Sequence, residues 1–224
     1  MGFTVFTRPD GKNLAVMVKL IGCSMVRENM KGEKRTGNPR NDRQKILMHI
    51  CCAPCSIYPL KELREQGVDV YGYFFNPNIH PFTEFMRRLA TLKDYAQFVA
   101  LPLDVDTAYD LAAFLRGALD YGKDRCRFCY RMRLEKTFKK AIEHKADAIT
   151  TTLLYSKYQR HDDIRDIGEE LSAEHGIPFL YQDFRVGWKE GVQTSKALNM
   201  YRQQYCGCIF SEKERYGGID AGHG

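Results

Sequence analysis

The chain has 224 residues, of which 44% are hydrophobic and 28% are charged, a composition typical of a globular protein with one sizeable core. No apolar run approaches the length of about 18 residues that a membrane-spanning helix needs, which excludes a helical membrane protein. The formal net charge of +6 is unevenly distributed, because residues 1–44 carry nine Lys or Arg against four Asp or Glu.

The first 44 residues differ in composition from the rest of the chain. They are basic and contain clusters of Gly and Asn, so we interpret residues 1–44 as a flexible N-terminal extension. The folded domain is predicted to span residues 45–216, and residues 217–224 are predicted to be a disordered tail.

The first predicted strand, residues 46–50, runs directly into a turn that is rich in cysteine. The run Ile-Leu-Met-His-Ile is typical of a short buried strand in a parallel sheet. Pro54 blocks further strand pairing, and Ser56 can cap a helix predicted over residues 57–66. In open α/β sheets ligands bind beyond the carboxyl ends of the strands. Since this turn holds cysteines and no Gly-rich phosphate loop, the sequence predicts thiolate chemistry rather than nucleotide binding.

Strands and helices alternate through the remainder of the chain, which predicts an α/β fold whose parallel strands are joined by helical crossovers. The pattern shows no internal repeat. Further strands are predicted at residues 68–75, 101–105, 147–153 and 179–181, and further helices at residues 81–100, 107–121, 126–144, 162–175 and 192–204.

Two of the cysteine groups suit a metal site. Cys51 and Cys52 are adjacent, and Cys126 and Cys129 form a CxxC at a predicted helix start, where the helix N-terminus favours thiolates. Such bunching opposes a secreted disulfide scaffold and is typical of metal or redox sites in a reducing compartment. The four thiolates satisfy either a [4Fe–4S] cluster or a four-cysteine structural zinc site.

A third group, Cys206-Gly207-Cys208, points to redox exchange. A disulfide between these cysteines would close a very small ring and would be strained and easily reduced. Two further metal ligands or two idle thiols are the alternatives. Cys55 faces the same predicted crevice and is interpreted as a spare ligand, whereas Cys23 lies in the N-terminal extension and is interpreted as idle.

One predicted helix is strongly basic. Residues 125–140 hold seven Lys or Arg against one Glu. A basic patch beside a thiol site indicates a polyanionic substrate such as nucleic acid. The alternative is an ordinary solvated helix face.

Other polar residues allow two interpretations each. Asp183 and Arg185 follow a predicted strand end, so they either reach the crevice or form a simple ion pair. His49 is interpreted as a core histidine because it lies in a buried strand. His80 and His161, at the edges of predicted loops and helices, are interpreted as surface caps.

Six blocks of the sequence resemble epoxyqueuosine reductases of the QueH type. The order and spacing of so many blocks make the resemblance specific, and it covers about residues 45 to 215. Residues 1–44 lie outside it. The blocks are His49–Cys55 (HICCAPC), Tyr73–His80 (YFFNPNIH), Cys126–Leu134 (CRFCYRMRL), Thr151–Ser156 (TTLLYS), Asp183–Arg185 (DFR) and Tyr201–Ser211 (YRQQYCGCIFS).

The resemblance implies a fold and an activity. The implied fold is a Rossmann-like parallel sheet akin to the adenine nucleotide α-hydrolases, in which the cysteine turn replaces the pyrophosphate loop and argues against ATP use. The implied activity is that of a cytoplasmic oxidoreductase, independent of cobalamin. Such an enzyme reduces the epoxide of epoxyqueuosine at the tRNA wobble position to queuosine, the last step of queuosine biosynthesis.

The resemblance also implies roles for individual cysteines. Cys51, Cys52, Cys126 and Cys129 match the ligands of a [4Fe–4S] cluster, and Cys206 and Cys208 match a pair expected to form a redox-active disulfide. Cys55 receives no fixed role, and an additional iron near it is left open.

The combined interpretation assigns a role to each group. Cys206 and Cys208 relay electrons, and Asp183 donates or orients a proton, so these three are the predicted catalytic residues. The predicted partners are a tRNA with a queuosine-type wobble base and an electron donor that the sequence does not identify. The predicted tRNA-binding side chains are Arg125, Arg127, Arg131, Arg133 and Lys136, with Arg185 holding a phosphate.

Two alternative functions were weighed against this interpretation. An ATP-dependent tRNA-modifying enzyme of the same fold needs a phosphate loop, and none is visible in the sequence. A zinc-stabilised RNA-binding module predicts a colourless protein that contains zinc and catalyses no turnover.

Overall fold

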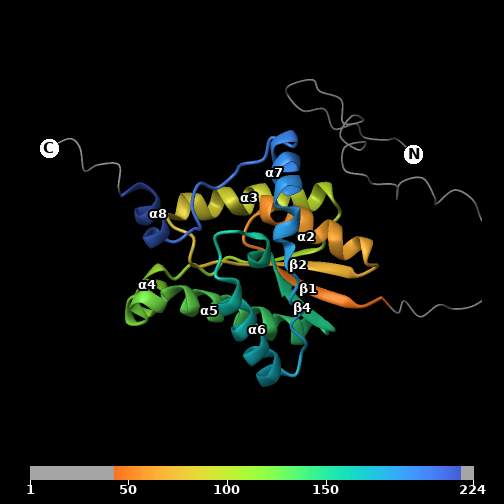
Figure 1. Ribbon diagram of the computed structural model, residues 1–224, viewed down its shortest axis with the longest axis horizontal. Coiled ribbons are helices and arrows are strands. Elements are labelled where there is room, and N and C mark those ends of the chain that lie inside the picture. Colours follow the sequence, from red (N-terminus) through yellow and green to blue (C-terminus); the bar gives the residue numbers. More distant parts are fainter. Residues whose placement is uncertain (1–42, 218–224) are drawn as a thin grey trace, which may run out of the picture.

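A four-stranded parallel sheet forms the centre of the computed structural model, which describes residues 43–217 (Figure 1). The predicted Rossmann-like α/β fold is confirmed, because the strand order β3-β2-β1-β4 matches the first four positions of a doubly wound sheet. The flexible extension predicted over residues 1–44 falls almost entirely outside the described residues. The strands are β1 (Lys45–His49), β2 (Asp69–Phe75), β3 (Leu103–Asp106) and β4 (Ala148–Thr151).

Strand β1 lies in the interior of the sheet. Its Leu47 pairs with Tyr71 of β2 on one side and with Ile149 of β4 on the other. Every residue of β1 except Lys45 is buried, as expected for a strand covered on both faces. The chain therefore leaves the interior of the sheet at the point where the cysteine turn begins.

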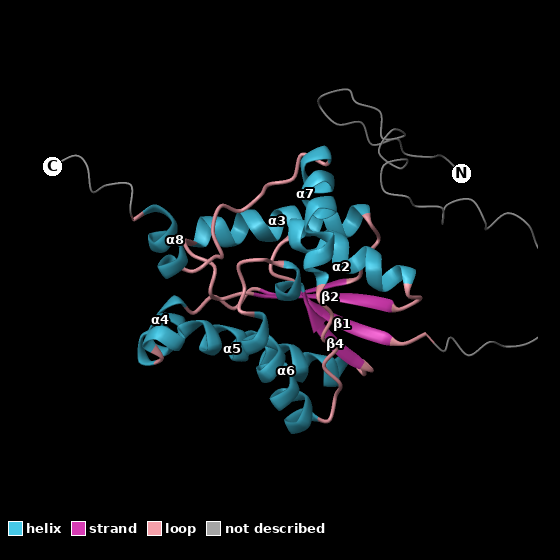
Figure 2. Cartoon of the chain, in the orientation of Figure 1, coloured by secondary structure: helices cyan, strands magenta, loops and turns pink. Residues whose placement is uncertain are grey.

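Helices cover both faces of the sheet (Figure 2). Helices α2 (Ala53–Glu65), α3 (Phe82–Phe98) and α7 (Trp188–Ala197) lie on one face, and helices α4 (Leu111–Asp120), α5 (Arg125–His144) and α6 (His161–His175) lie on the other. A last helix, α8 (Ile209–Tyr216), contributes Phe210 to a small apolar cluster with Phe114 and Phe128. The 3-10 turns are η2 (Gly122–Asp124), η3 (Thr152–Tyr155) and η4 (Phe184–Gly187).

Helix α2 begins four residues earlier than predicted and so takes in part of the cysteine turn. Pro54 lies in its first turn, where a proline is tolerated because the backbone N–H has no helical partner there. Ser56 does not cap the helix, since its hydroxyl donates to the Ala53 carbonyl oxygen at 2.8 Å. Asp110, by contrast, caps α4 by accepting a hydrogen bond from the Ala113 N–H at 2.8 Å.

The last third of the chain departs most from the sequence-based prediction. The strand predicted at 179–181 is reduced to a single bridge between Ile149 and Phe179. The helix predicted at 192–204 ends at Ala197, so residues 198–208 form an irregular loop that the prediction missed, as it missed α8. Within the described range, no helix is both long and apolar enough to cross a membrane.

Candidate functional site

Cysteines from three separate segments line one cavity of about 630 Å³ at the carboxyl ends of the strands. Cys51 and Cys55 come from the turn after β1 and the start of α2. The first turn of α5 contributes Cys126 and Cys129, and the loop before α8 contributes Cys206 and Cys208. The structure thus brings the predicted thiol groups to the crevice position expected for an open α/β sheet.

Cys51, Cys52 and Cys55 form the tightest of these groups. Their sulfur atoms all lie within 4.8 Å of one another, and those of Cys51 and Cys52 are 3.8 Å apart. The early start of α2 explains this arrangement, because it places Cys55 in the first turn of the helix, next to the turn that carries Cys51 and Cys52. Three soft sulfur ligands at this spacing are able to bind a metal ion.

Within this triad, hydrogen bonds and burial shift the pKa values of the three thiols in opposite directions. Bonds from Cys52 and Cys55 hold the pKa of Cys51 well below its ordinary value. The pKa of Cys52 is raised, chiefly by burial, and that of Cys55 is raised chiefly by its bond to Cys51. The arrangement therefore favours the thiolate form at Cys51, and a bound cation would displace the remaining protons.

Two polar side chains also orient the triad. Gln203 donates from Nε2 to the Cys52 sulfur at 2.9 Å and to the Cys55 sulfur at 3.3 Å. The Thr152 hydroxyl donates to the Cys51 sulfur at 3.4 Å. Sequence reasoning missed both residues. Gln203 lay within a matching block, but the helix predicted over residues 192–204 concealed that this segment is a loop reaching the cysteines.

Cys126 and Cys129 face the cavity without joining the triad. Among the described residues, their sulfurs do not belong to the group of ligand atoms within 4.8 Å. Burial raises the pKa of Cys126 and raises that of Cys129 to about 12. Burial therefore opposes the thiolate form that the helix N-terminus was expected to favour.

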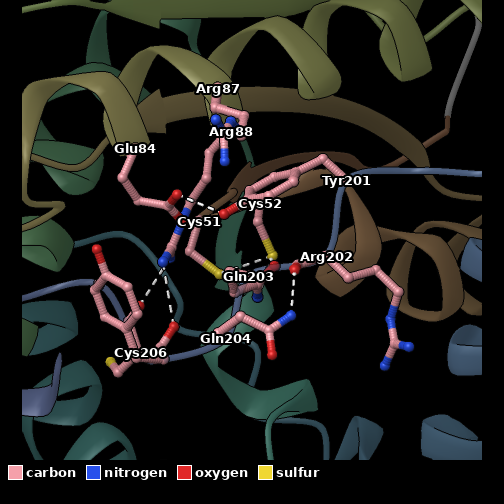
Figure 3. Close-up of polar contacts among 12 residues, drawn as sticks. Cys51, Cys52, Glu84, Arg87, Arg88, Tyr201, Arg202, Gln203, Gln204 and Cys206 are labelled. Carbon is pink, nitrogen blue, oxygen red and sulfur yellow. Dashed lines mark hydrogen bonds and ion pairs between the residues drawn. The ribbon is translucent and has the colours of Figure 1, made fainter. Parts of the chain in front are cut away.

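A buried arginine holds the loop that carries Cys206 and Cys208. Arg88 of α3 donates to the Cys206 carbonyl oxygen at 2.9 Å and to the Tyr205 carbonyl oxygen at 3.2 Å. It also pairs with Glu84 at 2.7 Å, and Glu84 accepts from the Tyr201 hydroxyl at 2.5 Å (Figure 3). Since Arg88 is only 1% exposed, this network fixes the loop against α3. The sequence carried no signal for it.

Within that loop, Cys206 and Cys208 are both free thiols in this structure. Gly207 between them has φ +146°, in the region that favours glycine. A side chain there would come within 3.3 Å of the Arg88 guanidinium. Gln159 donates to the Cys206 sulfur at 3.3 Å. Their pairing as a disulfide stays a prediction.

The three histidines that the sequence analysis singled out, His49, His80 and His161, are all buried. His49 bonds through Nδ1 to the Thr151 hydroxyl at 2.9 Å, as expected for a core histidine, and burial lowers its pKa to about 4. The interpretation of His80 and His161 as surface caps is wrong, since they are 3% and 7% exposed. His80 accepts at Nδ1 from the Ile209 N–H at 3.3 Å and thereby attaches α8 to the loop before α3.

Most of the predicted tRNA-binding cations are neutralised by carboxylates. Arg133 is the exception, because it is 1% exposed and faces the cavity rather than the surface. The role of the others stays a prediction. Arg125 pairs with Glu214, Arg127 with Asp163 at 2.6 Å, Arg131 with Glu170 at 2.5 Å, and Lys136 with Asp106 at 3.5 Å.

Asp183 and Arg185 form the ion pair that was the alternative to a role in the crevice. Asp183 accepts from Arg185 Nε at 2.8 Å and from Nη2 at 2.6 Å. Neither residue is among those lining the cavity. Hydrogen bonding to Arg185 lowers the pKa of Asp183 to about 2, so its carboxylate is a poor proton donor near neutral pH.

Comparisons with known proteins identify close relatives of this chain. The sequence profile of a family described as "Epoxyqueuosine reductase QueH" matches residues 46–214. Curated proteins named epoxyqueuosine reductase QueH are similar: that of Dehalococcoides mccartyi is 38% identical over 77% of this chain and 95% of its own length. That of Staphylococcus epidermidis is 34% identical over 80% of each chain, and that of Thermotoga maritima is 32% identical over 76% and 91%.

A solved structure shows a weaker likeness. A predicted subunit of tRNA methyltransferase from Methanocaldococcus jannaschii aligns with a TM-score of 0.49 at 11% identity, covering 68% of this chain and 74% of that one. A likeness at this level supports no functional statement.

Proposed function

This chain belongs to the epoxyqueuosine reductase QueH family, and from that premise we propose that it reduces the epoxide of epoxyqueuosine in tRNA to queuosine. It is then an oxidoreductase that acts in the cytoplasm at the last step of queuosine biosynthesis. The observation that supports the proposal most is the meeting of six thiols from three segments in one cavity. Removing an epoxide oxygen needs two electrons and two protons, and such a cavity suits both a redox-active metal group and a dithiol.

The donor set fits an iron–sulfur cluster. Thiolates select iron–sulfur clusters or zinc, and a [4Fe–4S] cluster takes four of them. A buried guanidinium nitrogen of Arg133, without a hydrogen-bond partner in the described part of the chain, also suits an anionic group in this cavity. Cys51, Cys52, Cys126 and Cys129 are the proposed ligands, and Cys55 is placed to help hold an additional iron. When bound, the cluster supplies electrons and a Lewis acid.

The chain's own residues divide the remaining work. Gln203 and Thr152 orient the sulfurs of the triad. Oxidation of the Cys206 and Cys208 thiols to a disulfide releases two electrons and two protons, which balances the conversion of an epoxide to an alkene and water. Arg88 holds the loop in place for this exchange. An external donor, not identified, then restores the dithiol.

The mouth of the cavity carries side chains suited to single-stranded RNA. Tyr158 is 81% exposed, and its ring meets that of Trp188 edge-on at 5.9 Å. Lys157 places its ammonium 5.7 Å from the Trp188 ring. Exposed aromatic rings stack on unpaired bases, and nearby cations attract phosphates. We propose this rim, Lys157, Tyr158 and Trp188, as the entry for the wobble nucleoside, in addition to the cations predicted on α5.

The rival functions are less well supported. The turn after β1 holds Cys51, Cys52 and Pro54 where ATP use would need a phosphate loop, so the ATP-dependent alternative is not favoured. A zinc-stabilised binding module would use the same triad but would catalyse nothing. The direct test is incubation of anaerobically purified protein with epoxyqueuosine-containing tRNA and a chemical reductant, without cobalamin. Queuosine in the digested tRNA supports the proposal, and unchanged epoxyqueuosine with iron-loaded protein contradicts it.

A further inference from the structure

Two buried arginines lie close to the cysteine-bearing segments: Arg88 holds the loop that carries Cys206, and Arg133 lines the cavity itself. Arg88 pairs with Glu84 and donates to two carbonyl oxygens. Arg133 of α5 donates from Nε to the Cys129 carbonyl oxygen at 3.1 Å, one turn back along its own helix. Its Nη2 is fully buried and has no hydrogen-bond partner among the described residues.

An isolated buried charge is expensive, so a side chain like Arg133 indicates an anion that completes its surroundings. The described residues supply no carboxylate for it, in contrast to the Glu84 that faces Arg88. Arg133 instead lines the thiol cavity. Burial acts to lower the pKa of Arg133, and Cys129, Cys206 and Cys51, one thiol from each of the three segments, would each raise it in their thiolate forms.

We propose that Arg133 is the counter-ion of the cluster rather than a ligand of the tRNA backbone. Its free N–H donates a hydrogen bond to a thiolate or sulfide of the bound group, and its charge stabilises the reduced, more negative form of that group. Arg133 therefore raises the reduction potential of the cluster while binding neither iron nor substrate. The inference rests on the proposed function, because it presupposes a thiolate-ligated cluster in this cavity.

The test is a redox titration of cluster-loaded Arg133→Gln, Arg133→Lys and Arg131→Gln, followed by the visible spectrum. Arg131 is a matched control, since it lies on the same helix and carries the same charge but is 37% exposed and paired with Glu170. The Gln variant at 133 should be at least about tenfold harder to reduce, which for a one-electron couple is a fall of about 59 mV. Arg133→Lys, which keeps the charge, and Arg131→Gln should stay near the wild-type potential.

The remaining outcomes also distinguish the inference from its alternatives. If Arg133→Gln and Arg131→Gln have the same cluster reduction potential, the inference is wrong and the proposed function is unaffected. If Arg133→Gln folds, as judged by circular dichroism, but loses iron, the Lys variant decides: retained iron supports the charge role, and lost iron overturns it. If Arg133→Gln does not fold, a Lys variant at the wild-type potential supports the inference and a Lys variant with the lowered potential overturns it. Wild-type protein without a cluster would instead refute the proposed function itself.

Discussion

The buried pair of Arg88 and Glu84 is the residue-scale device that fixes the loop carrying Cys206. Because removing one partner strands the other charge in the interior, Arg88→Met should lower the free energy of unfolding by about 3–5 kcal/mol. Arg87 is its matched control, as it lies next in the chain but is exposed, with its guanidinium 4.9 Å from the Tyr201 ring. Arg87→Met should cost about 1 kcal/mol or less. Urea unfolding of both variants measures the difference, and equal losses would contradict the clamp.

At this same scale the sequence predicted which residue types carry the chemistry but not their surroundings. The cysteine turn was recognisable because Cys51, Cys52 and Cys55 are close together in the chain. The roles of Arg88 and Gln203 were not, since the loop carbonyls that Arg88 binds lie 117 and 118 residues away and the sulfurs that Gln203 binds lie 148 and 151 residues away. Burial was also hidden, which is why Arg133 was grouped with the predicted tRNA-binding side chains. Only the packing of α5 against the sheet shows that it faces the cavity.

Among the elements, helix α8 depends on the neutral form of His80. The Ile209 N–H at the start of α8 donates to His80 Nδ1, which a protonated ring cannot accept. Burial lowers the pKa of His80, so its contribution to stability is present near neutral pH and is lost as the pH falls below the unfolded-state value of about 6.5. Hydrogen exchange should show loss of protection at Ile209 as the pH falls below about 6.5. In His80→Phe the protection should be weak throughout and insensitive to pH.

The two cysteine-bearing elements should respond differently to substitution. Cys126→Ser in α5 should abolish cluster binding, because it removes a proposed ligand. Cys206→Ser in the irregular loop should leave iron and sulfide unchanged but reduce turnover, because it removes half of the dithiol. Metal analysis beside the tRNA assay distinguishes the two. Loss of iron from Cys206→Ser would show that this division of roles is wrong.

The prediction of secondary structure succeeded for segments whose structure follows from a local apolar pattern. It failed for segments whose structure is set by contacts with residues far away in the chain. Strands β1 and β2 and helices α3, α5 and α6 follow apolar patterns that are visible locally. The start of the segment at residues 198–208 was predicted to be helical. It forms a loop instead, held by the bond from Arg88 to the Tyr205 carbonyl oxygen and by the bond from Gln203 to the Cys52 sulfur. Tertiary contacts of this kind override local propensity, and a single sequence does not reveal them.

For the molecule as a whole, the position of Trp188 makes tRNA binding directly observable. It is the single tryptophan of the chain and lines the cavity mouth beside Tyr158. Adding tRNA should quench its fluorescence, and the affinity should fall steeply with salt, because phosphate contacts release counter-ions. Tyr158→Ala should weaken binding by about 1–3 kcal/mol, the value of one stacked base.

Tyr121→Ala is the control for this rim. Tyr121 is 50% exposed but is not among the residues lining the cavity, so its removal should leave the affinity unchanged. If Tyr158→Ala and Tyr121→Ala changed the tRNA affinity equally, the proposal that the rim binds tRNA would be wrong. A tRNA affinity that does not change with salt concentration would contradict the prediction that the cations on α5 bind the tRNA backbone.

The most direct test of the central claim is the content of iron, acid-labile sulfide and zinc in the anaerobically purified protein, read with its visible spectrum. The account predicts brown protein with near-equal iron and sulfide, about four of each per chain, and at most one further iron beside Cys55. Colourless protein with about one zinc per chain and no sulfide would contradict it. The triad of Cys51, Cys52 and Cys55 would then be a structural metal site.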